Sequence, residues 1–100
     1  MATNEPRWHP AGVEDALAAR DWYAERSPFA ARGFLLELDD AVGAVLQAPR
    51  SGPPGRANTR RLVFTGSYPY TLVYRLLPDD QIEIVAVAHH KRRPDFWLRR

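Results

Sequence analysis

Apolar residues recur every three or four positions over two stretches of the chain, and this spacing predicts two helices. The first is expected to run from Pro10, which suits a first helical turn, to about Arg26. Glu14 and Asp15 favour the positive N-terminal end of this helix. Arg20 falls inside the apolar stripe and needs solvent or a carboxylate partner. The stripe itself consists of Val13, Ala16, Leu17, Tyr23 and Ala24.

Ser27 and Pro28 signal the start of the second helix, because a hydroxyl N-cap precedes a proline at the first helical position. Pro49 ends this helix after about five turns. A link of only one or two residues between the helices predicts an antiparallel hairpin. The apolar stripe of the second helix is Ala31, Phe34, Leu35, Leu38, Ala41, Val42, Val45 and Leu46.

After a proline- and glycine-rich loop over residues 49–59, the apolar period changes to two, which is typical of strands. Short turns join the expected strands, so they form an antiparallel meander over residues 61–64, 70–76 and 82–88. The last of these has few polar residues and is expected to be central or covered on both faces. Residues 7–9 can add a short edge strand, and Pro94 permits a short final helical turn with Phe96 and Trp97.

These elements predict an α+β fold, in which an N-terminal helical hairpin packs on one face of a small antiparallel β-sheet and a short C-terminal helical turn follows. The 100 residues form a single domain, residues 1–100, with its core at about residues 8–98. A hydrophobic share of 45% and a charged share of 26% are ordinary for a globular protein, so disorder is not expected.

Composition excludes several kinds of site. Without cysteine the chain has no disulfide scaffold, no thiolate metal site and no cysteine nucleophile. His89 and His90 are neighbours on a strand and point to opposite faces, so no metal site or cofactor is expected. The longest aliphatic run, Ile84 to Ala88, is too short to cross a membrane, and residues 1–12 lack the apolar segment of a secretory signal. We therefore expect a soluble, cytoplasmic protein without a membrane partner.

The net charge of +2 hides an uneven distribution. Residues 1–48 carry four arginines and eight acidic residues, a net charge of −4, whereas residues 49–100 carry ten basic and four acidic residues, a net charge of +6. Residues 89–100 combine five basic side chains, two histidines and two aromatic rings, a composition typical of surfaces that bind RNA or an acidic protein. The alternative is a solvated tail in which Phe96 and Trp97 close the core.

The order of these segments resembles the RelE/ParE toxin superfamily of bacterial type II toxin–antitoxin systems, and ParE most of all. The resemblance implies a plasmid-stabilisation type of toxin that arrests growth. It also implies a cognate antitoxin whose C-terminal segment lies across the helical hairpin and the sheet. The matching segments are residues 14–17 with Trp22 and Tyr23, residues 27–30, Pro49, Arg61, residues 68–75, the strand at 82–88 and residues 89–97.

Two activities divide the superfamily. RelE-like members cut mRNA on the ribosome, which requires cations around the scissile phosphate and an acid–base group. This chain has Thr71 where RelE-like proteins carry an arginine, and Trp97 in place of a C-terminal tyrosine. An ungapped alignment also places Leu62 and Phe64 at two lysine positions.

ParE-like members poison DNA gyrase and need no catalytic residue, and the resemblance favours this activity. Its candidate target-binding residues are Arg61, Arg75, His90, Lys91, Arg92, Arg93 and Trp97. The alternative is a ribosome-dependent mRNA endoribonuclease, in which Arg61, His90, Lys91 and Arg93 carry the chemistry. A third possibility is a family member that binds its antitoxin but has lost toxicity.

Overall fold

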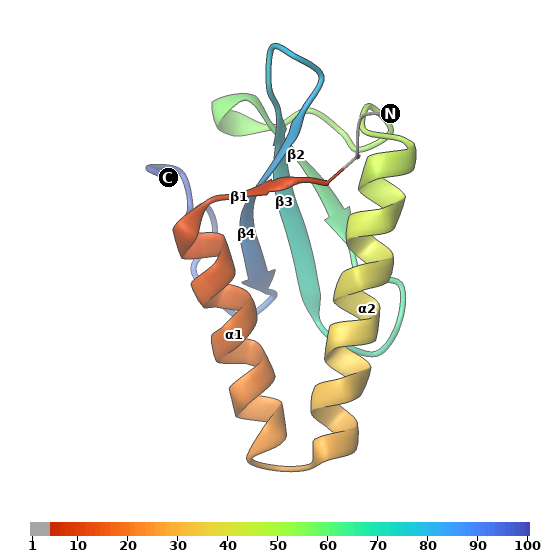
Figure 1. Cartoon of the computed structure of the whole chain (residues 1–100). Coiled ribbons are helices and arrows are strands. Elements are labelled where there is room, and N and C mark those ends of the chain that lie inside the picture. The colour runs from red at the N-terminus through yellow and green to blue at the C-terminus, as the bar shows by residue number, and fades with distance from the viewer. Residues whose placement is uncertain (1–4) are drawn as a thin grey trace.

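Two helices and a four-stranded sheet make up the computed structural model, which describes residues 5–100 (Figure 1). The α+β class is confirmed, and the first four residues of the domain expected over 1–100 lie outside the described part. The elements in chain order are β1 (Arg7–Trp8), α1 (Pro10–Ala24), α2 (Pro28–Gln47), a 3₁₀ turn (Arg56–Asn58), β2 (Thr59–Val63), β3 (Tyr70–Leu76) and β4 (Ile82–His89).

The sheet has the order β1-β4-β3-β2. Strands β2, β3 and β4 form the expected antiparallel meander, and β3 has the predicted boundaries. The edge strand β1 is also present, but it pairs in parallel with β4, so the sheet is mixed and not purely antiparallel. A purely antiparallel sheet was expected because short turns join the other three strands. β1 reaches β4 through most of the chain, so no short turn fixes its direction.

Local capping fixes the start of each helix. The ring nitrogen Nδ1 of His9 accepts a hydrogen bond from the Ala11 amide, and Pro10 takes the first helical position. The Ser27 hydroxyl accepts hydrogen bonds from the amides of Phe29 and Ala30, at 3.2 and 3.4 Å. The predicted hairpin is confirmed, although α1 ends at Ala24 and not at about Arg26.

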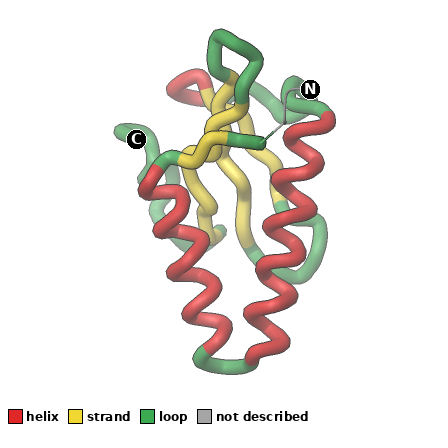
Figure 2. Tube along the Cα trace, viewed as in Figure 1, coloured by secondary structure: helices red, strands yellow, loops and turns green. Residues whose placement is uncertain are grey.

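The hairpin covers one face of the sheet. Figure 2 shows both helices in red, side by side in front of the yellow strands. Between the layers lies an aromatic core in which the rings of Phe34 and Tyr70 meet edge-to-face at 5.1 Å. Its fully buried members include Phe34, Val45, Leu72, Tyr74 and Ile84.

Helix α1 buries only part of the predicted stripe, namely Ala16 and, packed against the core, Tyr23. Gly12, Ala16 and Ala19 face the sheet, whereas Val13 and Leu17 are 39% and 43% exposed. The cause is close packing: a Cβ on Gly12 would lie only 3.1 Å from the carbonyl oxygen of Ile84. Small residues therefore form the interface with β4, and the larger aliphatic residues remain on the outside.

A second, smaller cluster lies on the opposite face of the sheet. Trp97 is 3% exposed and packs with Val73, Val85 and Ala86, flanked by Phe96 and Leu98. Strand β4 is thus central and covered on both faces, as expected. The segment that brings Trp97 there forms consecutive turns where a short helical turn was predicted, with the amide of Leu98 donating to the carbonyl of Asp95 at 3.0 Å.

The contact at Gly12 generates a test of this packing. Gly12→Val should lower the free energy of unfolding by about 1–3 kcal/mol, because the branched side chain must push β4 away from α1. The matched change Gly43→Val enters open space on α2 and should alter stability by less than about 0.5 kcal/mol. Urea unfolding of both variants checks this, and equal effects would contradict the close approach of α1 to β4.

Candidate functional site

Five of the seven predicted target-binding residues lie around one shallow pocket. The pocket has a volume of about 190 Å³ and opens on the face of the sheet that the helices leave uncovered. Strands β2 and β3 supply one wall, and the segment after β4 supplies the other. The five residues are Arg61, His90, Arg92, Arg93 and Trp97.

The side chains in this pocket differ in what they can offer. His90 is exposed, and its Nε2 lies 3.0 Å from the hydroxyl of Thr71. Arg61 and Arg93 are exposed and take part in none of the ion pairs among residues 5–100. The ring of Trp97 is buried in the second core cluster and offers no face for stacking on a base.

The register of β2 changes the comparison with ribosome-dependent nucleases. Phe64 is 5% exposed in the core, and Leu62 packs against that core, so both side chains lie on the helix-covered face. The positions of this stretch that alternate onto the uncovered face are Arg61 and Val63. On this stretch the uncovered face therefore carries one cation, Arg61, and one exposed apolar residue, Val63, whereas a RelE-like nuclease would have two lysines.

Arg75 does not join this group. It pairs with Glu83 on the neighbouring strand, at 2.9 Å between Nη1 and Oε1, and both side chains are largely shielded from solvent. Arg75 also lies four residues along β3 from Thr71, toward the opposite end of the strand. The pair is thus a cross-strand contact within the sheet.

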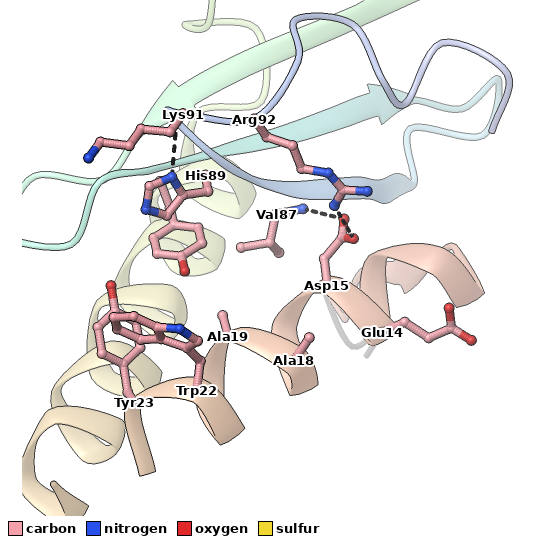
Figure 3. A pocket seen from close by; sticks show the side chains of 11 residues that line it. Glu14, Asp15, Ala18, Ala19, Trp22, Tyr23, Val87, His89, Lys91 and Arg92 are labelled. Carbon is pink, nitrogen blue, oxygen red and sulfur yellow. Dashed lines mark hydrogen bonds and ion pairs between the residues drawn. The ribbon is translucent and has the colours of Figure 1, made fainter. Parts of the chain in front are cut away.

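Lys91 lines a different and larger pocket, which Figure 3 shows from close by. This pocket has a volume of about 640 Å³ and lies between α1 and the end of β4. Trp22 and Tyr23 on α1 form its lower wall and point toward His89. Arg92 lies at the border, because it lines both pockets.

Asp15 has a structural role that differs from the one expected for it at the N-terminal end of its helix. Its carboxylate is 6% exposed and accepts hydrogen bonds from the amide of Val87 at 3.1 Å and from the guanidinium of Arg100. Arg92 adds a third interaction at 3.3 Å, and Arg100 also donates to the carbonyl of Val85. Asp15 therefore ties the C-terminal segment to the edge of β4 and does not act at the helix terminus.

The outer surface of the hairpin carries several exposed apolar side chains among its charged ones. A groove of about 610 Å³ lies over the two helices, between Arg20 and Ala24 on α1 and Leu35 on α2. Exposed apolar patches of this kind mark surfaces that bind another protein. The large apolar side chains exposed on the hairpin are Val13, Leu17, Trp22, Phe29, Leu35 and Leu36, with Phe29 the most exposed at 82%.

The described residues were also compared with the requirements of a metal site and of a membrane-spanning helix. Among residues 5–100, no group of three histidine, aspartate or glutamate side chains is arranged to hold a metal ion. Neither described helix combines the length and the apolar character needed to cross a membrane.

Comparisons with known proteins show what this chain is similar to. The family model for the ParE toxin of the type II toxin–antitoxin system parDE matches residues 7–94. The chain is 31% identical to toxin RelE2 of Caulobacter vibrioides over 85 residues, which covers 85% of this chain and 93% of that protein. It is 35% identical over 74 residues to a toxin candidate of Sinorhizobium fredii, Y4kP, covering 72% of this chain and 75% of the relative.

A solved structure from the chromosomal ParDE system of P. aeruginosa has the same fold. Its TM-score is 0.73 at 19% sequence identity, and the match covers 85% of this chain and 94% of that one.

The Asp15 contacts predict a stability effect far from any reactive group. Asp15→Asn should lower the free energy of unfolding by about 2 kcal/mol, because Arg100 loses a charged partner in a mostly buried position. Asp40→Asn, at an exposed position on α2, should change it by less than about 0.5 kcal/mol. Thermal or urea unfolding of both variants measures the difference, and equal stabilities would show that the contact contributes nothing.

Burial in the core raises the pKa of the Tyr70 hydroxyl, and the neighbouring Tyr23 raises it further. The folded chain therefore resists deprotonation, whereas the unfolded chain releases this proton near pH 10. Stability should be unaffected by this group below pH 10 and fall by about 1.4 kcal/mol per pH unit above it. Tyr70→Phe should remove this part of the slope. Unfolding curves of both proteins at about pH 9.5 to 11.5 test the difference. Equal slopes of stability against pH for the two proteins would contradict it.

Proposed function

We propose that this chain, which belongs to the ParE toxin family of type II toxin–antitoxin systems, arrests growth in the cytoplasm by poisoning DNA gyrase and is neutralised by a cognate antitoxin. In this function the toxin is a binding protein, and the strand break is made by gyrase.

The observation that carries the proposal is a cationic surface on which the acid–base set of a nuclease is incomplete. Arg61 and Arg93 are exposed and outside the ion pairs of the described chain, so they are available to an anionic or acidic surface. Around them, Thr71 and Val63 bring no positive charge, and Trp97 has no titratable hydroxyl. A docking surface needs cations alone, whereas phosphodiester cleavage also needs a proton donor and acceptor.

His90 supports the alternative of a ribosome-dependent endoribonuclease. It is exposed beside Arg61 and Arg93 in the same pocket, and an imidazole can act as a general base there. Its contact with the Thr71 hydroxyl would fix the ring in place. Lys91, the fourth residue of this alternative, lies on the other pocket and is separated from the group.

The hairpin supports an antitoxin partner. Its exposed apolar side chains, with Phe29 and Leu36 about two helical turns apart on α2, offer a protein-binding surface on the face away from the sheet. A partner that covers the hairpin leaves the cationic pocket on the opposite side of the sheet for a target.

The proposal predicts the outcome of a gyrase assay. Purified chain, freed of antitoxin, should inhibit DNA supercoiling by gyrase and cause cleaved DNA to accumulate. The double variant Arg61→Glu/Arg93→Glu should require about tenfold more protein for the same inhibition, because it reverses charges on the docking surface. Arg50→Glu, a charge reversal at another exposed arginine, is the matched control and should be nearly as active as the unmodified chain.

The three hypotheses predict different results. Folded protein that binds its antitoxin but leaves gyrase unaffected would refute gyrase poisoning. Cleavage of mRNA on translating ribosomes, lost in His90→Ala, would then establish the endoribonuclease. Absence of both effects would identify a member that has lost its toxicity.

A further inference from the structure

Helix α2 presents a stripe of exposed residues to solvent. Its members are spaced by three or four positions, so they lie on one face of the helix. At the centre of the stripe Leu36 is 60% exposed. Exposed apolar side chains of this size mark a surface that contacts another protein. The stripe consists of Phe29, Arg32, Leu36, Asp40 and Gly43.

The charges of the stripe have opposite signs on the two sides of its centre. Arg32 lies four residues before Leu36 and Asp40 four residues after it, so each is about 6 Å from Leu36 along the helix axis. Arg32, Asp40 and the adjacent Asp39 take part in none of the ion pairs within residues 5–100. The remaining charged residue of α2, Glu37, accepts hydrogen bonds from backbone amides of the turn after β2 and belongs to the fold.

The shape of the stripe is complementary in the same way. Phe29 lies seven residues before Leu36, and Gly43 lies seven residues after it. The ring of Phe29 protrudes into solvent, whereas a Cβ on Gly43 would meet no other part of the chain within 4 Å. A large ring and an open space thus lie at equal distances, about 10 Å, on the two sides of the centre. A stripe with this arrangement fits a copy of itself that runs in the opposite direction.

We propose that two copies of the free chain associate through this stripe, with α2 antiparallel to α2 about a two-fold axis that passes by Leu36. This axis places Leu36 on the partner's Leu36 and Arg32 beside the partner's Asp40. It also places Phe29 over the partner's Gly43. A parallel pair would instead bring Arg32 against the partner's Arg32, and repulsion between like charges disfavours it.

A second copy is favoured over other occupants because it offers an opposite charge to each charge of the stripe. A purely acidic partner would meet repulsion from Asp39 and Asp40, and a purely basic one would meet it from Arg32. The inference concerns the chain without its antitoxin and does not depend on the target of the toxin. One helix from each copy makes a small interface, so the dimer is expected to be weak, with a dissociation constant of about 10–100 µM.

Sedimentation equilibrium of the purified full chain, at about 2–200 µM, measures this association. Arg32→Glu should weaken the dimer by about tenfold or more, because the new carboxylate faces the partner's Asp40. The double variant Arg32→Glu/Asp40→Arg exchanges the two charges and should recover most of the lost affinity. General damage to the helix would not produce this recovery.

A second test and two matched controls complete the set. Leu36→Asp brings two like charges together at the axis and should abolish the dimer. Arg99→Glu makes a charge reversal at an exposed position outside the stripe, and Val63→Asp introduces the same acid at an exposed apolar position on β2. Both controls should dimerise within about twofold of the unmodified chain. Circular dichroism verifies the fold of every variant, and either test variant suffices if the other fails to fold.

Three outcomes would contradict the proposal. A chain that stays monomeric up to about 200 µM would overturn it and leave the exposed stripe to the antitoxin alone. A dimer that Arg32→Glu and Leu36→Asp leave unchanged would form through another surface, and the assignment of this stripe would be wrong. Loss of affinity in Arg32→Glu without recovery in the exchanged variant would overturn the antiparallel arrangement.

Discussion

Packing of the helical hairpin on one face of the sheet leaves the other face to the last residues of the chain. α1 and α2 bury the first face around Phe34 and Leu72. On the opposite face, Trp97 covers Val73 and its neighbours, but a segment of a few residues cannot extend over the whole sheet. Arg61 therefore remains in solvent beside the covered part. The cationic pocket exists because the second layer of this fold is incomplete.

The parts of the fold that local chemistry determines could be predicted from the sequence. Ser27 and Pro28 start α2 through contacts within a few residues, and the alternation over Tyr70–Leu76 gave β3 its correct bounds. Burial of Gly12, and not of Val13, depends instead on the carbonyls of a strand that lies about seventy residues later in the chain. Helical periodicity records which residues are apolar, but it does not reveal that close packing requires the smallest ones.

The candidate site was predictable to the same extent. The structure brings His90, Arg92 and Arg93, which the sequence groups by charge after β4, into one pocket with Arg61, a candidate that the family resemblance supplied. Asp15 pairs with Arg100 across 85 positions of the sequence, and no local pattern predicts such a contact between opposite charges. The position of Lys91 could not be predicted either. The chain turns after His89, so the consecutive residues His90 and Lys91 line different pockets.

The basic segment serves two purposes, and its charges divide accordingly. Arg92 and Arg100 are held by Asp15 and stabilise the fold, so fewer cations are available to a partner than the sequence suggests. Among the available ones, Lys91 lies on the α1 side and Arg93 on the uncovered face of the sheet, with Arg92 lining both pockets between them.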